Sequence, residues 1–366
     1  MDTDRIEIKL NNKKCYDILI SDDFSGLESE LGAILPGRKR ACLFTDSNVR
    51  DIYGNEVRDI LLKVFEEVHI FSCEAGENSK NLDTIKDAYI FLIENKFNRQ
   101  DVIIALGGGV CGDMAGFTAA TYLRGIDFVQ LPTTLLSQVD SSIGGKTGVD
   151  LNEYKNMVGA FYMPKLVYIN ISVLNTLPDR DYSSGIAEVL KSGLIKSAWF
   201  YEWMIGNFGE IMAREPEYVR GMISNSLNIK KSVIEKDPFE QGERALLNFG
   251  HTLGHALEKY YDFSMSHGEC VALGCIAASF ISFKRGLLST EEYYEIRDMF
   301  VPFSLPISIE DADVSKILSY TRSDKKNDGQ GLKFILLKKT GKAFVDRTVT
   351  EDEMRSAIEE LIYKEE

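Results

Sequence analysis

Histidine, tryptophan and basic residues are scarce in this chain of 366 residues. It has four histidines, two tryptophans and eight prolines, and its 42 Lys and Arg stand against 56 Asp and Glu, which gives a net charge of −14. That acidic balance argues against nucleic acid or an anionic membrane surface as a partner. A small anionic substrate remains compatible with it, but such a substrate would need a local cluster of Lys and Arg.

Long hydrophobic runs and paired cysteines are also lacking. The longest apolar candidate, 271–283, is shorter than the roughly 18 residues that a membrane span needs, so we expect a buried helix there. The first residues, MDTDRIEIKL, carry acids where a signal peptide would carry basic residues. The six cysteines form no CxxC pair, and we expect them to be reduced core residues of a cytoplasmic protein.

The first half of the chain alternates apolar strands with helical patterns. Strands are predicted at 41–45, 68–72, 101–106 and 128–131, and helices at 49–62, 82–97 and 114–122. This βαβ order predicts a doubly wound, Rossmann-like parallel sheet. Helical patterns then dominate, at 184–195, 199–208, 218–235, 252–260, 270–284 and 290–299, before a short hairpin at 333–345 and a closing helix.

The length favours two domains. We predict an α/β domain over 1–180 and a mainly helical, all-α domain over 181–366, with the active site in the cleft between them.

Three of the four histidines fall within 17 residues, at His251, His255 and His267. Asn248 to Gly250 resembles a helix entry, which would place His251 and His255 on one helical face, while His267 would come from a returning loop. Single capping or core histidines are the alternative, but three converging imidazoles favour a divalent metal such as zinc. Glu188 and Lys191 lie in the apolar helix GIAEVLKSGLI, either as a buried ion pair or as site residues, and we favour Glu188 as a further ligand.

Two glycine-rich segments predict anion binding. Gly107, Gly109 and Gly112 match a dinucleotide fingerprint after a strand, although a tight strand–helix turn would also need glycine. Asp46 is the better candidate for the ribose-binding acid and Glu77 the second. Further on, Lys146 follows two glycines and Lys155-Asn156 precedes Gly159, in what we interpret as glycine turns around an anion. Lys230, Arg244 and Asn248, on predicted helices, and the polar turn 324–327 supply further polar groups.

Together these segments resemble the 3-dehydroquinate synthase family. The resemblance is carried by GGGVCGDMAGFTAATYLRG, LPTTLLSQVDSSIGGKTGVD, KNMVGAFYMP, AEVLKSGLI, LNFGHTLGHALE and SHGECVALG, and it covers roughly 46–327 in the family's order and spacing. It implies a Rossmann-like domain followed by a helical one, and usually a homodimer. It also implies NAD and zinc or cobalt as cofactors, and a sugar-phosphate substrate, 3-deoxy-D-arabino-heptulosonate 7-phosphate.

The resemblance assigns roles to individual residues. The implied metal ligands are Glu188, His251 and His267, whereas His255 becomes a substrate-side residue that helps proton movement. The implied NAD contacts are Asp46, Asn48, Gly76, Glu77, Lys80, Gly108, Gly109, Val110, Asp113, Thr133, Thr134, Lys146, Lys155 and Thr176. The implied substrate pocket consists of Asp140, Lys146, Asn156, Lys191, Lys230, Arg244, Asn248, His255 and one of Lys325 or Lys326.

Three other interpretations are kept open. Another sugar phosphate cyclase, such as 2-deoxy-scyllo-inosose synthase, would share the cofactor, the metal and the opening chemistry. A metal-dependent polyol dehydrogenase of related fold would release NADH instead of reusing it. A non-catalytic binding protein would not need Glu188, Lys191 and three histidines together.

Overall fold

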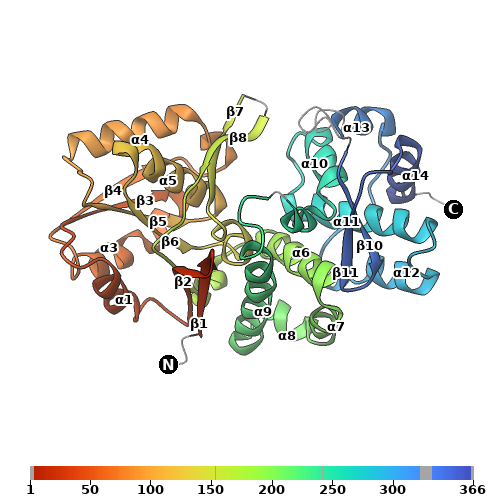
Figure 1. Cartoon of the computed structure of the whole chain (residues 1–366), viewed down its shortest axis with the longest axis horizontal. Coiled ribbons are helices and arrows are strands. Elements are labelled where there is room, and N and C mark those ends of the chain that lie inside the picture. Colours follow the sequence, from red (N-terminus) through yellow and green to blue (C-terminus); the bar gives the residue numbers. More distant parts are fainter. Residues whose placement is uncertain (1–3, 153, 241, 322–331, 364–366) are drawn as a thin grey trace. The chain divides into compact units, whose positions relative to one another are not determined.

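The computed structural model describes residues 4–152, 154–240, 242–321 and 332–363. The chain separates into two compact units, Met1–Leu177 and Pro178–Glu366 (Figure 1). No helix within the described ranges has both the length and the hydrophobicity that crossing a membrane requires.

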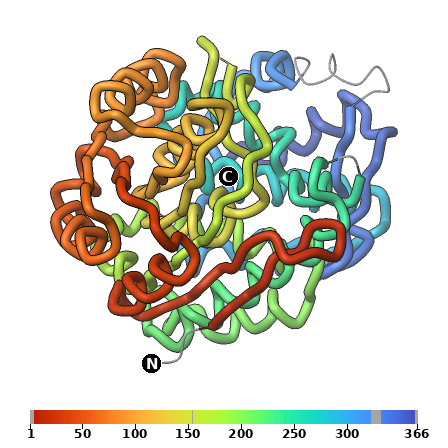
Figure 2. The backbone as a smooth tube through the Cα atoms, turned by 60° about the vertical axis from the view of Figure 1, so that its left-hand side comes forward, coloured from red at the N-terminus to blue at the C-terminus, as the bar shows by residue number. Residues whose placement is uncertain are grey.

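The first unit is built on a seven-stranded sheet with the order β1-β2-β9-β6-β5-β3-β4. Its strands are β1 (Asp4–Leu10), β2 (Lys13–Ser21), β3 (Arg40–Asp46), β4 (Glu67–Cys73), β5 (Val102–Gly107), β6 (Asp127–Pro132) and β9 (Leu166–Asn170). All neighbours are parallel except β1, which pairs with β2 as an antiparallel hairpin at one edge, the red end of the tube in Figure 2. In the centre, Ile104 pairs with Leu43 on one side and Val129 on the other.

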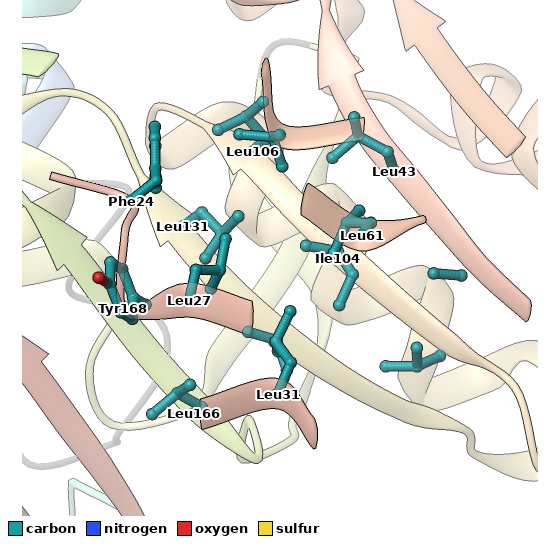
Figure 3. Close-up of a cluster of buried hydrophobic side chains, with 14 of the residues drawn as sticks. Phe24, Leu27, Leu31, Leu43, Leu61, Ile104, Leu106, Leu131, Leu166 and Tyr168 are labelled. Carbon is teal, nitrogen blue, oxygen red and sulfur yellow. The ribbon is translucent and has the colours of Figure 1, made fainter. Parts of the chain in front are cut away.

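Helices cover both faces of this sheet. Alternate residues of β5 point to opposite faces and are buried on both, as expected for a central parallel strand. On one face Ile104 and Leu106 pack with α1 (Leu27–Ile34) and α3 (Asn55–Leu61), as Figure 3 shows. On the other face Ile103 and Ala105 pack with α4 (Leu82–Glu94) and α5 (Gly109–Thr121). The predicted doubly wound α/β sheet is confirmed.

The segment interpreted as glycine turns forms a hairpin instead. Strands β7 (Lys146–Leu151) and β8 (Tyr154–Phe161) pair antiparallel, with Gly148 opposite Gly159. A Cβ on Gly159 would lie 2.2 Å from the carbonyl oxygen of Thr147, so these glycines allow two strands to approach closely. The prediction of a turn was therefore wrong at Gly159, where glycine serves strand packing, whereas Gly144 and Gly145, with φ 93° and 66°, do form a turn before β7.

Helix α5 begins earlier than predicted. It starts at Gly109, not at Met114, and Gly108 precedes it in an extended conformation. Gly109 therefore lies in its first turn, where the backbone N–H groups have no partner within the helix, whereas the Gly112 N–H donates to the carbonyl of Gly108 at 3.0 Å.

The second unit is mainly helical and is organised around α11. Its helices are α6 (Asp179–Lys196), α7 (Ala198–Gly206), α8 (Phe208–Met212), α9 (Pro216–Ile234), α10 (His251–Tyr260), α11 (His267–Lys284), α12 (Thr290–Asp298), α13 (Val314–Thr321) and α14 (Glu351–Leu361). The predicted hairpin is present as β10 (Phe334–Lys339) and β11 (Lys342–Asp346). Helix α11 is buried along most of its length and contacts α6, α10, α12, α14 and β10. The expectation of a mainly helical second half is confirmed.

The cysteines carry free thiols. Cys42, Cys111, Cys270 and Cys275 are buried, while Cys15 and Cys73 are half-buried. Burial raises the pKa of the Cys42 thiol to about 12, so it stays protonated and behaves as a small apolar side chain.

Candidate active site

Glu188 and Lys191 form a buried ion pair on α6. The helix begins after Pro178 with Asp179 and Asp181 in its first turn, where the positive end of the helix dipole stabilises negatively charged side chains. Glu188 and Lys191 lie one turn apart on the same face, and each is 2% exposed. The Lys191 ammonium contacts Oε2 of Glu188. The other carboxylate oxygen, Oε1, is left to face the histidines of α10 and α11.

Gly250 sets the position of His251. Gly250 has φ 80°, in the left-handed region, and a Cβ there would lie 2.7 Å from the backbone nitrogen of Cys275. Only glycine fits at this close approach of α10 to α11. His251 is the first residue of α10, and its Nδ1 lies 3.2 Å from the carbonyl oxygen of Phe249. If Nδ1 donates to that carbonyl, Nε2 is left as an acceptor, and Nε2 lies 3.5 Å from Oε1 of Glu188.

His267 is the first residue of α11, not part of a returning loop. Ser266 caps the helix by a reciprocal pair of bonds with Glu269, in which Glu269 N–H donates to the Ser266 hydroxyl and Ser266 N–H donates to the Glu269 carboxylate. The loop prediction was wrong because this Ser-x-x-Glu signature was overlooked. His267 Nε2 lies 3.3 Å from Glu188 Oε1, and its Nδ1 lies 2.7 Å from Oε1 of Glu258.

The Glu188, His251 and His267 side chains fit a divalent ion. Two ligands bound at about 2.0–2.1 Å around a tetrahedral ion lie roughly 3.3–3.4 Å apart. The observed separations of 3.3 and 3.5 Å between Glu188 Oε1 and the two Nε2 atoms agree with that distance. Glu188 Oε1 is buried and accepts no hydrogen bond from the residues that the structure describes. Burying a carboxylate oxygen costs free energy of folding unless a cation or a hydrogen-bond donor satisfies it.

The electrostatics of this group also suit a cation. Burial opposes ionisation of Glu188, but Lys191 and the two histidines outweigh it and hold the pKa of the carboxyl well below its usual range. Burial, with Lys191 nearby, holds the pKa of His251 well below normal, so that the imidazole is neutral and can donate a lone pair. Burial also disfavours charge on His267, yet Glu188 and Glu258 raise its pKa to about 9. A cation would therefore compete with a proton at His267.

His255 lies beside this group but outside it. It is exposed on α10, and its ring centroid is 5.0 Å from that of His251 and 6.1 Å from that of His267. Its ligand atom instead lies near those of Glu258 and His267. Glu258 was missed by sequence reasoning, although an acid three residues after His255 in an apolar helix was a usable signal.

Three cations of the second unit are buried. Lys191, Lys230 and Arg244 are 2%, 5% and 2% exposed, on α6, on α9 and on the 3₁₀ helix Glu243–Asn248. Asn248 ends that 3₁₀ helix, and its amide donates to Glu240 Oε1 at 2.7 Å. The three elements that carry them contact one another, as a local Lys and Arg cluster for an anionic substrate requires. The predicted substrate contacts Lys325 and Lys326 lie outside the described residues.

In the first unit, two of the predicted dinucleotide residues, Asp46 and Thr134, lie next to the glycine turn that leads into α5. Asp46 ends β3 and accepts the backbone N–H groups of Asn48 and Val49, each at 3.0 Å. A Cβ on Gly107 would lie 3.2 Å from Asp46 Oδ2, and a Cβ on Gly108 would lie 3.0 Å from Thr134 Cγ2. Asp46 and Thr134 therefore adjoin the glycine turn.

Lys80 joins three segments that are distant in sequence. Its ammonium donates to Asp113 Oδ2 at 2.8 Å and to Asn156 Oδ1 at 2.7 Å. Burial works against its charge, but Asp113 and Glu77 more than compensate and raise the pKa of Lys80. Lys80 follows Gly76 and Glu77 in a short 3₁₀ turn.

The remaining predicted residues of this unit occupy varied positions. Thr133 N–H donates to the carbonyl of Gly107, and Thr176 is hydrogen-bonded to the Tyr53 hydroxyl at 2.7 Å. Val110 lies in the first turn of α5, and Asp140 lies in a π-helical turn, Ser137–Ser141. Lys146 is exposed at the start of β7, and Lys155 is half-buried in β8.

Comparison with known proteins agrees with this fold and site. Residues 70–184 match the model of the 3-dehydroquinate synthase N-terminal domain, and residues 185–327 match that of its C-terminal domain. The chain is 40% identical to 3-dehydroquinate synthase of Acetivibrio thermocellus over 95% of this chain and 97% of that one. It is 42% identical to the Clostridium beijerinckii enzyme, over 93% and 97% of the two chains. Among solved structures, 2-deoxy-scyllo-inosose synthase in complex with carbaglucose-6-phosphate, NAD+ and Co2+ matches with a TM-score of 0.87 at 26% identity, over 98% of this chain and 100% of that one.

A doubly wound unit followed by a mainly helical unit is the fold that this chain shares with two sugar phosphate cyclases, 2-deoxy-scyllo-inosose synthase and 2-epi-5-epi-valiolone synthase. Within that class, the 3-dehydroquinate synthases match nearly the whole chain at about 40% identity. The chain belongs to the 3-dehydroquinate synthase family.

Proposed function

We propose that this chain catalyses the reaction of its family. The reaction converts 3-deoxy-D-arabino-heptulosonate 7-phosphate to 3-dehydroquinate and phosphate, a step of the shikimate pathway to aromatic amino acids. It proceeds through transient oxidation of a ring alcohol, phosphate elimination, re-reduction, ring opening and an intramolecular aldol closure. The observation that carries the proposal is the family match over nearly the full length, together with the Glu188, His251 and His267 group in the helical unit.

We propose NAD and one zinc or cobalt ion as cofactors. The bound NAD+ and Co2+ of 2-deoxy-scyllo-inosose synthase support this, as do the separations of 3.3 and 3.5 Å between Glu188 Oε1 and the Nε2 atoms of His267 and His251. Glu188, His251 and His267 would hold the ion. The chemistry supplied by these groups when bound is polarisation of a ring hydroxyl and reversible hydride transfer.

The proposed NAD contacts are in the first unit. The N-terminus of α5 offers backbone N–H groups and a positive dipole end to the pyrophosphate, and Asp46 offers an acceptor to the ribose. The full proposed set is Asp46, Asn48, Gly76, Glu77, Lys80, Gly108, Gly109, Val110, Asp113, Thr133, Thr134, Lys146, Lys155 and Thr176.

The proposed substrate contacts centre on the buried cations. Arg244 can grip a carboxylate or phosphate with two parallel N–H bonds, whereas Lys191 and Lys230 act as point charges. Lys191 also holds Glu188 ionised, so it would serve metal and substrate together. The full proposed set is Asp140, Lys146, Asn156, Lys191, Lys230, Arg244, Asn248 and His255.

His255 is proposed to assist proton movement. It is exposed and lies within 5.0 Å, ring to ring, of His251, but it is not in the group around Glu188. Replacing His255 with Ala should keep the metal and lose rate, whereas replacing His267 with Ala should lose the metal. Metal analysis of the two purified variants decides this, and equal metal loss in both would refute the division of roles.

We further propose that the chain works in the cytoplasm as a homodimer, as its family usually does. Light scattering on the purified protein tests the dimer, and a monomer at working concentration would refute it.

One rival activity has a specific observation in its favour. The chain has the fold of 2-deoxy-scyllo-inosose synthase, with a TM-score of 0.87. Sequence identity to that enzyme is 26%, however, against 40–42% to the 3-dehydroquinate synthases. We therefore favour the heptulosonate substrate over glucose 6-phosphate.

One assay separates these activities. The purified protein is incubated with NAD, zinc and the heptulosonate phosphate, and phosphate, dehydroquinate and NADH are measured. We expect phosphate and dehydroquinate in equal amounts and no net NADH. Turnover of glucose 6-phosphate alone would support the rival cyclase, and NADH accumulating with glycerol would support a polyol dehydrogenase.

A further inference from the structure

A buried acid behind the metal group has no role in the proposed function so far. Glu258 lies on α10, seven residues after His251, and is 3% exposed. Its carboxylate oxygen Oε1 lies 2.7 Å from Nδ1 of His267. A carboxylate so far from water is retained only when strong hydrogen bonds or charges compensate its desolvation.

The short distance makes Glu258 a hydrogen-bond acceptor. An ionised carboxylate can only accept, so His267 Nδ1 carries a proton and Nε2 is the nitrogen that offers a lone pair when a cation displaces its proton. That lone pair is on the ring atom that lies 3.3 Å from Glu188 Oε1. Glu258 therefore selects the tautomer of His267 that can bind a cation next to Glu188.

A second cation held by His255, Glu258 and His267 is the competing interpretation, because their ligand atoms also cluster. The distances argue against it. Two ligands of one ion, each bound at about 2.0–2.1 Å in tetrahedral geometry, lie roughly 3.3–3.4 Å apart. The 2.7 Å between Glu258 and His267 is hydrogen-bond length and too short for that.

The two histidines of the group differ in what holds their Nδ1 atoms. His251 faces the neutral carbonyl of Phe249 at 3.2 Å, whereas His267 faces a carboxylate at 2.7 Å. A carboxylate fixes the ring more firmly and makes the imidazole a stronger donor to a metal. Glu258 also accepts the N–H of Phe263 through its backbone carbonyl, so this residue ties α10 to the segment that leads to His267.

We propose that Glu258 is a positioning residue for His267, which orients its imidazole toward Glu188 and sets the affinity of the metal site. This inference rests on the proposed metal site. Its consequence is that α10 supplies both one ligand, His251, and the group that orients the other histidine ligand.

The test compares Glu258→Ala, Glu258→Gln and the control Glu292→Gln. Glu292 also accepts a hydrogen bond through its carboxylate, from the backbone N–H of Ser289 at 2.8 Å, but it caps α12 outside the site. Cobalt affinity is measured by competition with a chelator, and the ligand field is followed by the visible absorption of the cobalt-loaded protein. Unfolding of each metal-free variant is measured separately, so that a general loss of fold is recognised.

We expect Glu258→Ala to weaken cobalt binding about 10- to 100-fold, as loss of such a partner typically does. Glu258→Gln keeps the shape and an acceptor oxygen, so it should restore part of the affinity while the cobalt absorption stays shifted by the lost charge. The control should match the wild-type protein. If the alanine variant fails to fold, the glutamine variant alone decides, since an unchanged affinity and absorption in it would overturn the proposal.

Two other results would also overturn it. Wild-type affinity and absorption in Glu258→Ala would remove the positioning role while the metal site stands. Two cobalt ions per wild-type chain, reduced to one by Glu258→Ala, would make Glu258 a ligand of a second ion. Absence of cobalt binding in the wild-type protein is a distinct result, because it would refute the proposed metal site itself and this inference with it.

Discussion

Glu188 takes part in two interactions through its two carboxylate oxygens. Oε2 contacts Lys191, and Oε1 faces Nε2 of both His251 and His267. The residue is 2% exposed, so the cost of removing its charge from water must be offset by these neighbours. The same carboxylate thus belongs to a structural ion pair and to a candidate metal site, and the two roles can be separated by experiment.

The ion pair predicts a strong coupling in the metal-free protein. Glu188→Leu should cost about 3–5 kcal/mol, because it leaves the Lys191 ammonium buried without its carboxylate. The double change Glu188→Leu with Lys191→Met should recover more than half of that loss. Urea unfolding of the two single variants and the double variant measures the coupling. If the losses in free energy of unfolding of the two single variants simply add in the double variant, Lys191 is charged and satisfied without Glu188.

At the scale of elements, glycine fixes how closely α11 approaches its neighbours. A Cβ on Gly268 would lie 2.1 Å from the carbonyl oxygen of Ser184 on α6, and the Gly268 N–H donates to the Ser184 hydroxyl at 2.9 Å. Ser184 lies one turn before Glu188, and Gly268 follows His267. The spacing between Glu188 and His267 therefore depends on a residue without a side chain.

Gly268→Ala should accordingly separate the two helices. We expect a loss of about 1–3 kcal/mol from overpacking, with weaker metal binding. The control is Gly206→Ala at the end of α7, where a Cβ would meet nothing within 4 Å. It should be neutral or stabilising by about 0.4–1 kcal/mol, because alanine restricts the unfolded chain. Thermal unfolding and cobalt titration of both variants test this, and unchanged cobalt affinity in Gly268→Ala would contradict it.

Helix α14 is tied to the end of α11 by one ion pair that predicts a pH dependence. Arg285 donates through Nε and Nη2 to the two carboxylate oxygens of Glu353, at 2.6 and 2.8 Å. These bonds, helped by Thr350, lower the pKa of Glu353 from 4.5 to about 2. Because the folded pKa lies below the unfolded one, this contribution to stability is complete above 4.5 and is lost as the pH falls toward 2.

The corresponding variant is Glu353→Gln, which cannot lose a proton. Wild type should exceed it in stability by a constant amount above the unfolded pKa, and the gap should close progressively toward a pH of about 2. Unfolding curves of both proteins across this range measure the gap. An equal gap at neutral and at acidic pH would mean that the ion pair does not contribute through the charge of Glu353.

The elements recognised from the sequence were those with an unbroken pattern. Strand β5 reads as an apolar run and α11 as a long apolar helix, since each is buried on all sides. The hairpin of β7 and β8 was missed because Gly148 and Gly159 weaken a strand pattern, and their purpose is visible only when the partner strand is present. The edge hairpin of β1 and β2 was missed because its outer strand is largely polar.

The sequence predicts which residues make up the candidate site, but it does not predict how they are arranged. Spacing alone grouped His251 with His255, because residues four apart share a helical face. The structure instead brings His251 and His267 together at Glu188, since each is the first residue of a helix and these two helices pack closely through Gly250 and Gly274. Such a close approach between helices leaves no periodic signal in the chain.

At the scale of the whole molecule, each proposed cofactor belongs to a different compact unit. Glu188, His251 and His267 all lie within 178–366, whereas Asp46 and the glycine turn before α5 lie within 1–177. A ligand that binds only the folded state stabilises it by about 2.7 kcal/mol at a hundred times its Kd. That stabilisation appears first in the segments whose opening would release the ligand.

Hydrogen exchange should therefore distinguish the two cofactors by region. Zinc added to chelator-treated protein should slow exchange at the N-termini of α10 and α11 and in the middle of α6, where its proposed ligands lie. NAD added alone should slow exchange around β3, the glycine turn and the first turn of α5. Mass spectrometry of peptides from the two units reads both effects, and His267→Ala supplies a control in which only the zinc effect is lost. Protection by zinc confined to 1–177, or protection by NAD confined to 178–366, would show that the cofactors were assigned to the wrong units.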